Sequence, residues 1–137
     1  LLIVIFNQII MDEIRVAIPT TNRKIDDHLK DCSYYTIYSI KSGKIVELNT
    51  TKVSQKYTNC NEIINYLSEL GIHVLIAGNI PSSEIEKIES LNIKVLPYYN
   101  GSIKSCISKY LQNFSFVQKK RNVGLIDLIS RVKKINH

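Results

Sequence analysis

The chain has 137 residues, of which 45% are hydrophobic and 22% charged, and its formal net charge is +6. This length allows one domain with its own hydrophobic core and is short for two. The charge is unevenly placed, because residues 113–137 hold six of the 18 basic residues and one of the 12 acidic ones. Residues 11–112 are nearly neutral, which argues against nucleic acid as a partner, and basic tails of this kind are more often solvated than bound.

The three cysteines, Cys32, Cys60 and Cys106, show no spacing typical of a disulfide framework or of a CxxC motif. This is the pattern of a protein in the reducing cytoplasm. Residues 1–10 are apolar but lack a basic flank and a cleavage site, and they have about half the length of a membrane span. We therefore expect no membrane association. Because Met11 directly precedes a strand pattern, residues 1–10 are interpreted as an upstream or non-native segment, the alternative being an extra edge strand.

The first half of the chain predicts three strands. Residues 13–19 alternate and then become apolar, and Pro19 is expected to end this strand because it removes a donor from the sheet. Residues 20–33 form a polar loop. Two β-rich runs follow at residues 34–40 and 44–49, joined by a short turn with Gly43. A turn of that length predicts a β-hairpin, so these two strands are antiparallel neighbours.

The second half predicts alternating helices and strands. A helix is expected to begin after Asn59 or Asn61 as N-cap and to end near Gly71. Residues 74–77 are wholly apolar, as in a strand covered on both faces. The spacing from Ser83 to Glu86 predicts a capping box at the start of a second helix, and residues 93–97 form a last strand.

Two further amphipathic stripes follow. From Gly101 onward, one predicted helix places Cys106 on an apolar face, where it is most simply a core residue; that face contains Ile103, Cys106, Ile107, Tyr110 and Leu111. The final stripe lies beside basic residues and predicts a helix that docks on the domain or serves a partner. It consists of Leu125, Leu128, Ile129, Val132 and Ile135, with Arg131, Lys133 and Lys134 beside it.

The order β-β-β-α-β-α-β-α predicts an α/β domain over residues 11–112, with a five-stranded mixed sheet and flanking helices, and a basic C-terminal helical extension over residues 113–137. In this topology the loops after the first, third and fourth strands reach the same edge of the sheet. Ligands of open α/β sheets favour the crevice at that edge where the chain direction reverses. The candidate site residues gathered there are His28, Cys32, Cys60, Gly78 and Asn79.

A histidine and a thiol four residues apart, His28 and Cys32, are the candidate metal ligands. Such ligands suit zinc, copper or iron-sulfur species, and the absence of a closed four-ligand spacing favours an open site. The alternative for each residue is structural, because most loop histidines are solvated and isolated cysteines are often buried. A two-metal nuclease needs converging carboxylates that the strands do not supply. A Cys-His hydrolase needs an orienting third group, and no pattern marks one.

From Met11 to about Leu111 the sequence resembles the dinitrogenase iron-molybdenum cofactor biosynthesis family, small domains of ribonuclease H-like fold that include carriers of metal clusters. The resemblance rests on residues 15–19, on His28 followed by Cys32 and an aromatic strand, on the Ser42-Gly43 turn and on residues 70–78. The family signature His-Phe-Gly-Arg is here His28-Leu29-Lys30-Asp31, so only the histidine matches. The glycine-rich turn of the family keeps only Gly78, followed by Asn79.

The resemblance implies a cytoplasmic protein without enzymatic activity that binds or shuttles an iron-sulfur or iron-molybdenum type cluster between donor and acceptor proteins. The resemblance implies His28 as the principal ligand. From their place at the same edge of the sheet, Cys32 and Cys60 are predicted to be auxiliary thiolates, and Gly78 and Asn79 to face the cluster anion. The alternative is a degenerate domain that binds no metal and acts as an interaction or regulatory module through its basic C-terminal helix. A hydrolase or nuclease ranks third.

Overall fold

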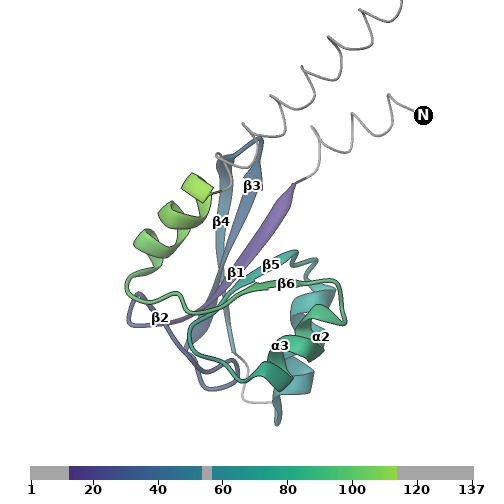
Figure 1. Cartoon of the computed structure of the whole chain (residues 1–137). Helices are drawn as coiled ribbons and strands as arrows, with labels where there is room; N and C mark the ends of the chain where they lie inside the picture. Colours follow the sequence, from purple (N-terminus) through teal and green to yellow (C-terminus); the bar gives the residue numbers. More distant parts are fainter. Residues whose placement is uncertain (1–12, 54–56, 114–137) are drawn as a thin grey trace, which may run out of the picture.

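A computed structural model describes residues 13–53 and 57–113 of the chain (Figure 1). The strands are β1 (Ile14–Thr21), β2 (Lys24–Ile25), β3 (Tyr34–Lys41), β4 (Lys44–Lys52), β5 (Val74–Ile76) and β6 (Lys94–Leu96). The helices are α2 (Cys60–Glu69), α3 (Ser82–Glu89) and a further helix over residues 103–113. One mixed sheet has the order β4-β3-β1-β5-β6, with β2 paired to β1. The predicted α/β fold with a mixed sheet is confirmed, and β2 is a sixth strand that the sequence did not indicate.

The strand directions follow the predicted topology. β1, β3 and β4 form an antiparallel meander, whereas β5 pairs in parallel with β1 and with β6. The turn between β3 and β4 has two residues in the left-handed region, Ser42 with φ 54° and Gly43 with φ 76°. Two consecutive residues of this kind form the hairpin turn whose twist matches that of the flanking strands. The hairpin prediction is therefore confirmed.

β1 does not end at Pro19, so that prediction is wrong. The strand continues to Thr21 and pairs with β3 as far as Thr20. The backbone of Arg15 forms hydrogen bonds with His73, which immediately precedes β5. Pro19 is four residues further along the strand, so its nitrogen faces the same edge of β1 as the nitrogen of Arg15. β5 pairs only with Val16 and Ala17. Further along this edge β2 pairs with Thr20 and Thr21, and the N–H of Asp26, which follows β2, donates to the Pro19 carbonyl. Pro19 therefore stays in the strand as a hydrogen-bond acceptor without an N–H of its own.

The two labelled helices differ in how they begin. Asn59 is the N-cap of α2, and its side-chain oxygen accepts the backbone N–H of Glu62 at 3.1 Å. At the other end of α2 the Arg15 guanidinium donates to the carbonyl of Leu70. α3 begins at Ser82 with Pro81 as its N-cap and without a side-chain capping bond. The predicted capping box is therefore wrong, because Ser83 already lies inside the first helical turn.

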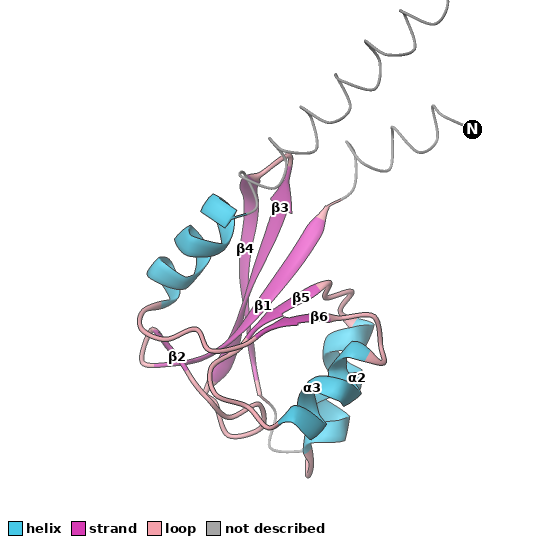
Figure 2. Cartoon of the chain, in the orientation of Figure 1, coloured by secondary structure: helices cyan, strands magenta, loops and turns pink. Residues whose placement is uncertain are grey.

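Each face of the sheet carries its own core (Figure 2). α2 and α3 cover one face, where Tyr35, Ile37 and Leu75 are buried with Ile63 and Leu67 of α2. The helix over residues 103–113 covers the other face through Ile103, Cys106, Ile107 and Tyr110, which pack on Val16, Ile18, Tyr38, Ile40 and Ile76. Cys106 is thus a core residue, as predicted. Residues 1–10 and the predicted C-terminal amphipathic helix lie outside the described residues.

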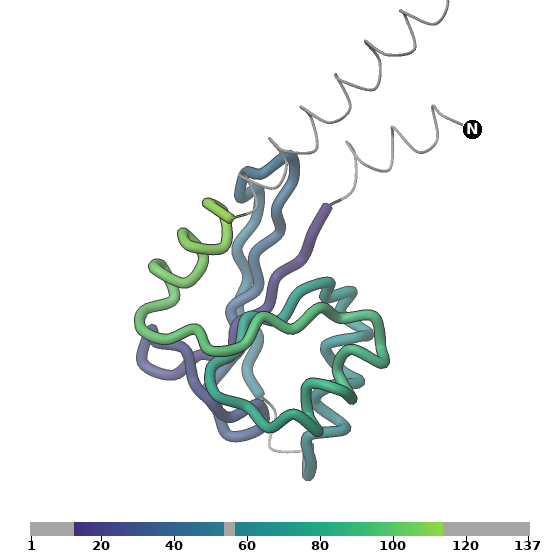
Figure 3. Tube along the Cα trace, viewed as in Figure 1, coloured from purple at the N-terminus to yellow at the C-terminus, as the bar shows by residue number. Residues whose placement is uncertain are grey.

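Within the described ranges, no helix has both the length and the apolar character needed to cross a membrane. The Cα trace in Figure 3 shows how the chain passes twice from one end of the sheet to the other through α2 and α3. These crossovers bring the loop after β1 and the loop after β5 to one edge of the sheet, where the candidate site lies.

Candidate functional site

The loop between β1 and β3 is tied to the end of β1 by backbone hydrogen bonds. The Asp26 N–H donates to the Pro19 carbonyl at 2.9 Å, and the Ser33 N–H donates to the Thr20 carbonyl at 3.0 Å. Leu29 is buried in the core beneath α2 and α3 and anchors the middle of the loop. The positions of residues 26–28 are therefore set by bonds on both sides and by one apolar anchor.

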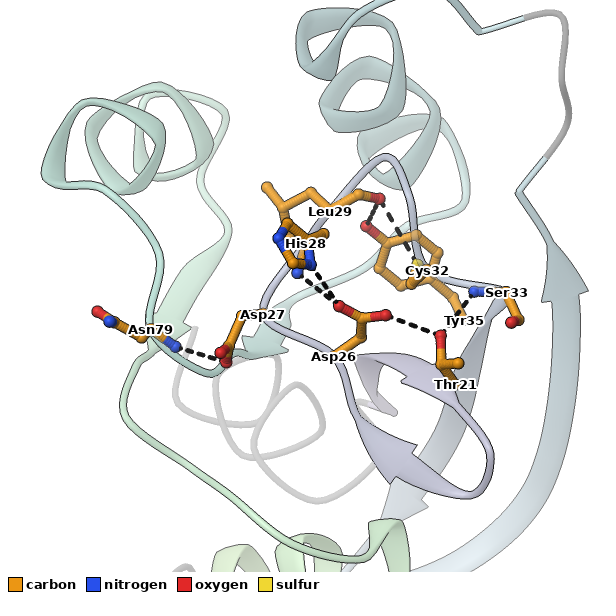
Figure 4. A network of polar contacts seen from close by, with 9 residues as sticks. All are labelled: Thr21, Asp26, Asp27, His28, Leu29, Cys32, Ser33, Tyr35 and Asn79. Carbon is orange, nitrogen blue, oxygen red and sulfur yellow. Dashed lines mark hydrogen bonds and ion pairs between the residues drawn. The ribbon is translucent and has the colours of Figure 1, made fainter.

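His28 is held by the carboxylate of Asp26 (Figure 4). Asp26 Oδ1 lies 2.8 Å from His28 Nδ1 and accepts the backbone N–H of His28 at 2.9 Å, while Asp26 Oδ2 accepts the hydroxyl of Thr21 at 2.8 Å. An ionised carboxylate only accepts hydrogen bonds, so Nδ1 carries the proton and the neutral ring has its lone pair on Nε2. The side chain of His28 is 71% exposed. The ring is thus oriented from one side and open on the other.

The same contacts shift the pKa values of both Asp26 and His28. The hydrogen bond from Asp26, followed by its negative charge, raises the pKa of His28 above 6.5. Desolvation alone would raise the pKa of Asp26, but the hydrogen bonds from Thr21 and from the backbone and ring of His28 outweigh it, and the pKa lies below 3.8. The pair is a surface interaction at an exposed ring, so its contribution to stability is small.

Asp27 links this loop to the turn after β5. Its Oδ1 accepts the backbone N–H of Asn79 at 2.9 Å, and a Cβ placed on Gly78 would lie 1.9 Å from the same oxygen. Only glycine therefore permits this approach. The amide that was expected to face an anionic cluster already has a carboxylate as its partner.

Cys32 lies in the core. Its side chain is 5% exposed, and its thiol donates to the carbonyl of Leu29 at 3.6 Å. The hydroxyl of Tyr35 donates to the same carbonyl at 2.6 Å. Desolvation raises the pKa of the Cys32 thiol to about 11. Since the thiolate is the form that binds metals, Cys32 in this conformation is a poor ligand at neutral pH.

Cys60 occupies the first position of α2 and is half-buried. Desolvation and then the negative charge of Glu84, in the first turn of α3, raise the pKa of its thiol. The charge of Asp31 also raises this pKa and the charge of Lys30 lowers it. Cys60 therefore lies close enough to the loop of His28 for charges in that loop to shift the pKa of its thiol. The thiol stays protonated in the neutral range and is more accessible than that of Cys32.

The structure brings the five predicted residues to one edge but not into one ligand set. His28 lies in the same loop as Asp27, which contacts the turn of Gly78 and Asn79. Cys32 points into the core beneath that loop. Across residues 13–53 and 57–113, no group of three or more histidine, cysteine, aspartate or glutamate side chains is arranged to hold a metal ion.

The two aspartates that shape the site lie within residues 20–33, which the sequence predicts only as a polar loop. Asp26 orients His28, and Asp27 bridges to a residue 52 positions later. The signal for Asp26 was available, because an acid two residues before a histidine can bond both its backbone and its ring. The signal for Asp27 was not, since it depends on how the crossover places the turn after β5.

The fold and the site define a class, a small mixed α/β domain with an oriented, exposed histidine at the carboxyl edge of the sheet, where direction reverses between β1 and its neighbours. The sequence model of the dinitrogenase iron-molybdenum cofactor family matches residues 12–113. The chain belongs to this family, as its resemblance indicated. No curated protein sequence matches the chain.

Solved structures share the fold at low sequence identity. PH0822 superposes with a TM-score of 0.67 and 20% identity, covering 73% of this chain and 90% of that one. A candidate dinitrogenase from Methanocaldococcus jannaschii has a TM-score of 0.61 and 17% identity over 75% and 92% of the two chains. The apo form of the orange protein from Desulfovibrio gigas has a TM-score of 0.59 and 14% identity over 72% and 88%.

Proposed function

We propose that this protein binds a metal cluster of iron-sulfur or iron-molybdenum type at the edge that carries His28, passes it from a donor to an acceptor protein and catalyses no reaction of its own. Membership of the iron-molybdenum cofactor family links the chain to cluster metabolism. Binding and transfer by this chain are the step that we add. In this proposal the cluster is cargo and not a resident cofactor.

The observation that carries the proposal is the pairing of Asp26 with His28. Histidines that ligate metals usually donate their other ring N–H to a carboxylate, which fixes the tautomer and raises the basicity of the metal-binding nitrogen. Asp26 stands in this relation to Nδ1, and Nε2 is left available on an exposed ring. The imidazole is therefore oriented for one metal bond before any ligand arrives.

The rest of the site supports weak and exchangeable binding. Cys60 is the thiol that can join His28 with the least rearrangement, because it is half-buried at the start of α2. Cys32 becomes a ligand only if the loop between β1 and β3 opens and its thiol leaves the carbonyl of Leu29. A site with one preset ligand and few others releases a cluster more readily than a closed four-ligand site. That property suits a carrier.

The test is anaerobic transfer of a preassembled cluster to the full chain, with bound iron, sulfide and molybdenum measured together with the visible spectrum. We expect uptake by the wild type, loss of uptake in His28→Ala and reduced uptake in Cys60→Ser. His137→Ala is the matched control, since it removes a histidine outside the family match. Cys32→Ser tests whether the second thiol is also a ligand. If this variant takes up as much cluster as the wild type, the ligand set is limited to His28 and Cys60. Equal uptake by wild type and His28→Ala contradicts the proposal.

A second candidate function is a domain that binds no metal and acts as an interaction module. It is favoured by the replacement of the family signature with His28-Leu29-Lys30-Asp31 and by the concentration of positive charge in residues 113–137. A wild type that takes up no cluster, together with partner capture that depends on those residues, supports this function over the first.

A further inference from the structure

β4 exposes an apolar surface that none of the described residues covers. Five large hydrophobic side chains are exposed in the described ranges, and three of them lie on this strand: Ile45 at 42%, Val46 at 55% and Leu48 at 55%. β4 is also the edge strand of the sheet, paired only with β3. Edge strands of soluble proteins are usually protected by charge, by a bulge or by a covering segment.

Two of these side chains continue the core beneath the helix over residues 103–113. Ile45 stands opposite Ile40 and Leu48 opposite Tyr38, and directly opposed residues in neighbouring strands share a face. A register shift between Ser39 and Ile40 inserts one extra residue into β4, so Ile45 and Leu48 lie on the same face although they are three positions apart. Both Ile40 and Tyr38 belong to the core cluster of that helix.

The opposite face of β4 has a neighbour. Thr51 stands opposite Tyr35, which is buried in the other core, and its hydroxyl lies 3.0 Å from the hydroxyl of Tyr66 on α2. Glu47 and Asn49, on the same face as Thr51, are exposed but polar. The uncovered apolar pair, Ile45 and Leu48, therefore lies on the side of the sheet that carries the helix over residues 103–113. That helix covers Tyr38 and Ile40 and stops short of the next strand.

The chain continues from the place where this cover ends. Tyr110 and Leu111, in the last turn of the helix over residues 103–113, pack in the same cluster as Tyr38 and Ile40. In Figures 1 and 2 this last turn lies at the end of the sheet where β3 turns into β4. The sequence then supplies residues 114–137, which lie beyond the family match and carry the apolar stripe of Leu125, Leu128, Ile129, Val132 and Ile135.

We propose that residues 114–137 fold back over β4 and bury the Leu125, Leu128 and Ile129 side of their stripe against Ile45 and Leu48. The dimensions allow it, because residues 114–124 can span roughly 35 Å when extended, and Ile45 and Leu48 are only about 10 Å apart along the strand. A helical stripe from 125 to 135 is roughly 15 Å long, which covers that distance. Arg131, Lys133 and Lys134 then remain on the solvent side.

The experiment uses the full chain with labelled isoleucine, leucine and valine methyl groups. We expect nuclear Overhauser contacts between the Leu48 methyl groups and those of Leu125, Leu128 or Ile129 in a uniformly labelled sample. In a sample that mixes differently labelled molecules, no such contact should appear between one molecule and another. Contacts seen only between differently labelled molecules mean that a second copy covers β4, and contacts to residues 1–10 mean that the other terminus does. Either result, or no contact to Leu48 from any of these segments, overturns the proposal.

Matched variants test the same surface without relying on assignment of one contact. Leu48→Asp and Ile129→Asp should each speed amide exchange in residues 125–135 by about tenfold or more, because each places a charge in the proposed interface. The controls introduce the same residue one position away: Asn49→Asp on the opposite face of β4 and Ser130→Asp beside the stripe. Exchange that is unchanged in Leu48→Asp, or equally fast in Leu48→Asp and Asn49→Asp, contradicts the proposal.

Discussion

At the scale of single residues, two adjacent aspartates, Asp26 and Asp27, have different hydrogen-bond partners. Asp26 turns inward to the strand end and holds the His28 ring, whereas Asp27 turns to the neighbouring turn and accepts the Asn79 N–H. Both therefore act on groups of the candidate site, Asp26 on Nδ1 of the His28 ring and Asp27 on a backbone amide. The polar side chains of this loop therefore fix the geometry of the candidate site.

We expect Asp26→Asn to lower the pKa of His28 toward 6.5, because the substitution removes the charge and weakens the hydrogen bond that raise it. The raised pKa of His28 stabilises the fold at pH values below 6.5 and this contribution is lost as pH rises through the folded pKa. The lowered pKa of Asp26 stabilises the fold above pH 3.8 and that contribution is lost as pH falls through the folded pKa. The pair is thus strongest between these two values.

The measurement is an NMR titration of the His28 ring in the wild type, in Asp26→Asn and in Asp31→Asn. Asp31 contributes only a smaller electrostatic part of the shift, so its variant should move the midpoint less. An unchanged midpoint in Asp26→Asn would show that the two side chains do not interact in solution.

Gly78→Ala should destabilise the protein by about 1–3 kcal/mol, because the added methyl group overlaps the Asp27 carboxylate and forces it away from the turn. Asp27→Ala removes the overlapping atoms. Urea unfolding of the wild type, both single variants and the double variant measures the effect. We expect the double variant to be no less stable than Asp27→Ala alone, and a strictly additive loss would contradict this contact.

At the scale of elements, helix ends are defined by individual side chains. α2 is capped by Asn59 at its beginning, and the Arg15 guanidinium from β1 donates to the carbonyl of Leu70 at its end. The second contact joins residues 55 positions apart, so α2 is fixed against the sheet at its last turn. Its first turn carries Cys60, and the cap therefore helps to place the accessible thiol of the candidate site.

Asn59→Ala should cost about 1 kcal/mol of stability, since it leaves the Glu62 N–H without its side-chain acceptor. Asn61→Ala is the matched control, because Asn61 is exposed inside the first turn and makes no capping bond. Thermal unfolding followed by circular dichroism compares the two. Equal losses in both variants would argue against Asn59 as the N-cap in solution.

At the scale of the whole molecule, one sheet carries two cores that depend on each other. β5 contributes Leu75 to the core of α2 and α3 and Ile76 to the core beneath the helix over residues 103–113. Adjacent residues of a strand point to opposite faces, so a single short strand joins both layers. A substitution that destabilises one core should therefore also destabilise the core on the other face of the sheet.

Leu75→Ala should lower the free energy of unfolding by about 2–5 kcal/mol, as expected when a fully buried leucine is truncated. Leu91→Ala is the control, because Leu91 is among the exposed hydrophobic residues, and it should cost far less. Far-ultraviolet and tyrosine near-ultraviolet signals should give one coincident transition. Separate transitions in Leu75→Ala would mean that the two cores unfold independently.

Local patterning was sufficient for most elements of this fold. The hairpin of β3 and β4, the buried strand β5 and the amphipathic face with Cys106 follow from alternation, turn chemistry and helical spacing, which act over a few residues. The errors were also local. β1 passes through Pro19 because this residue takes part only through its carbonyl, which accepts the Asp26 N–H, and Ser83 does not cap α3 because the helix begins one residue earlier.

The sequence by itself determined the family, the α/β class and the edge of the sheet at which His28 lies, because these depend on element order and on short motifs. The tertiary structure alone decided which groups meet at that edge. Asp27 reaches Asn79 across 52 residues, Cys32 is withdrawn into the core, and Ile45 and Leu48 remain uncovered. The physical reason is that hydrogen bonds, desolvation and exposure depend on neighbours in space, and the parallel crossovers place those neighbours far apart along the chain.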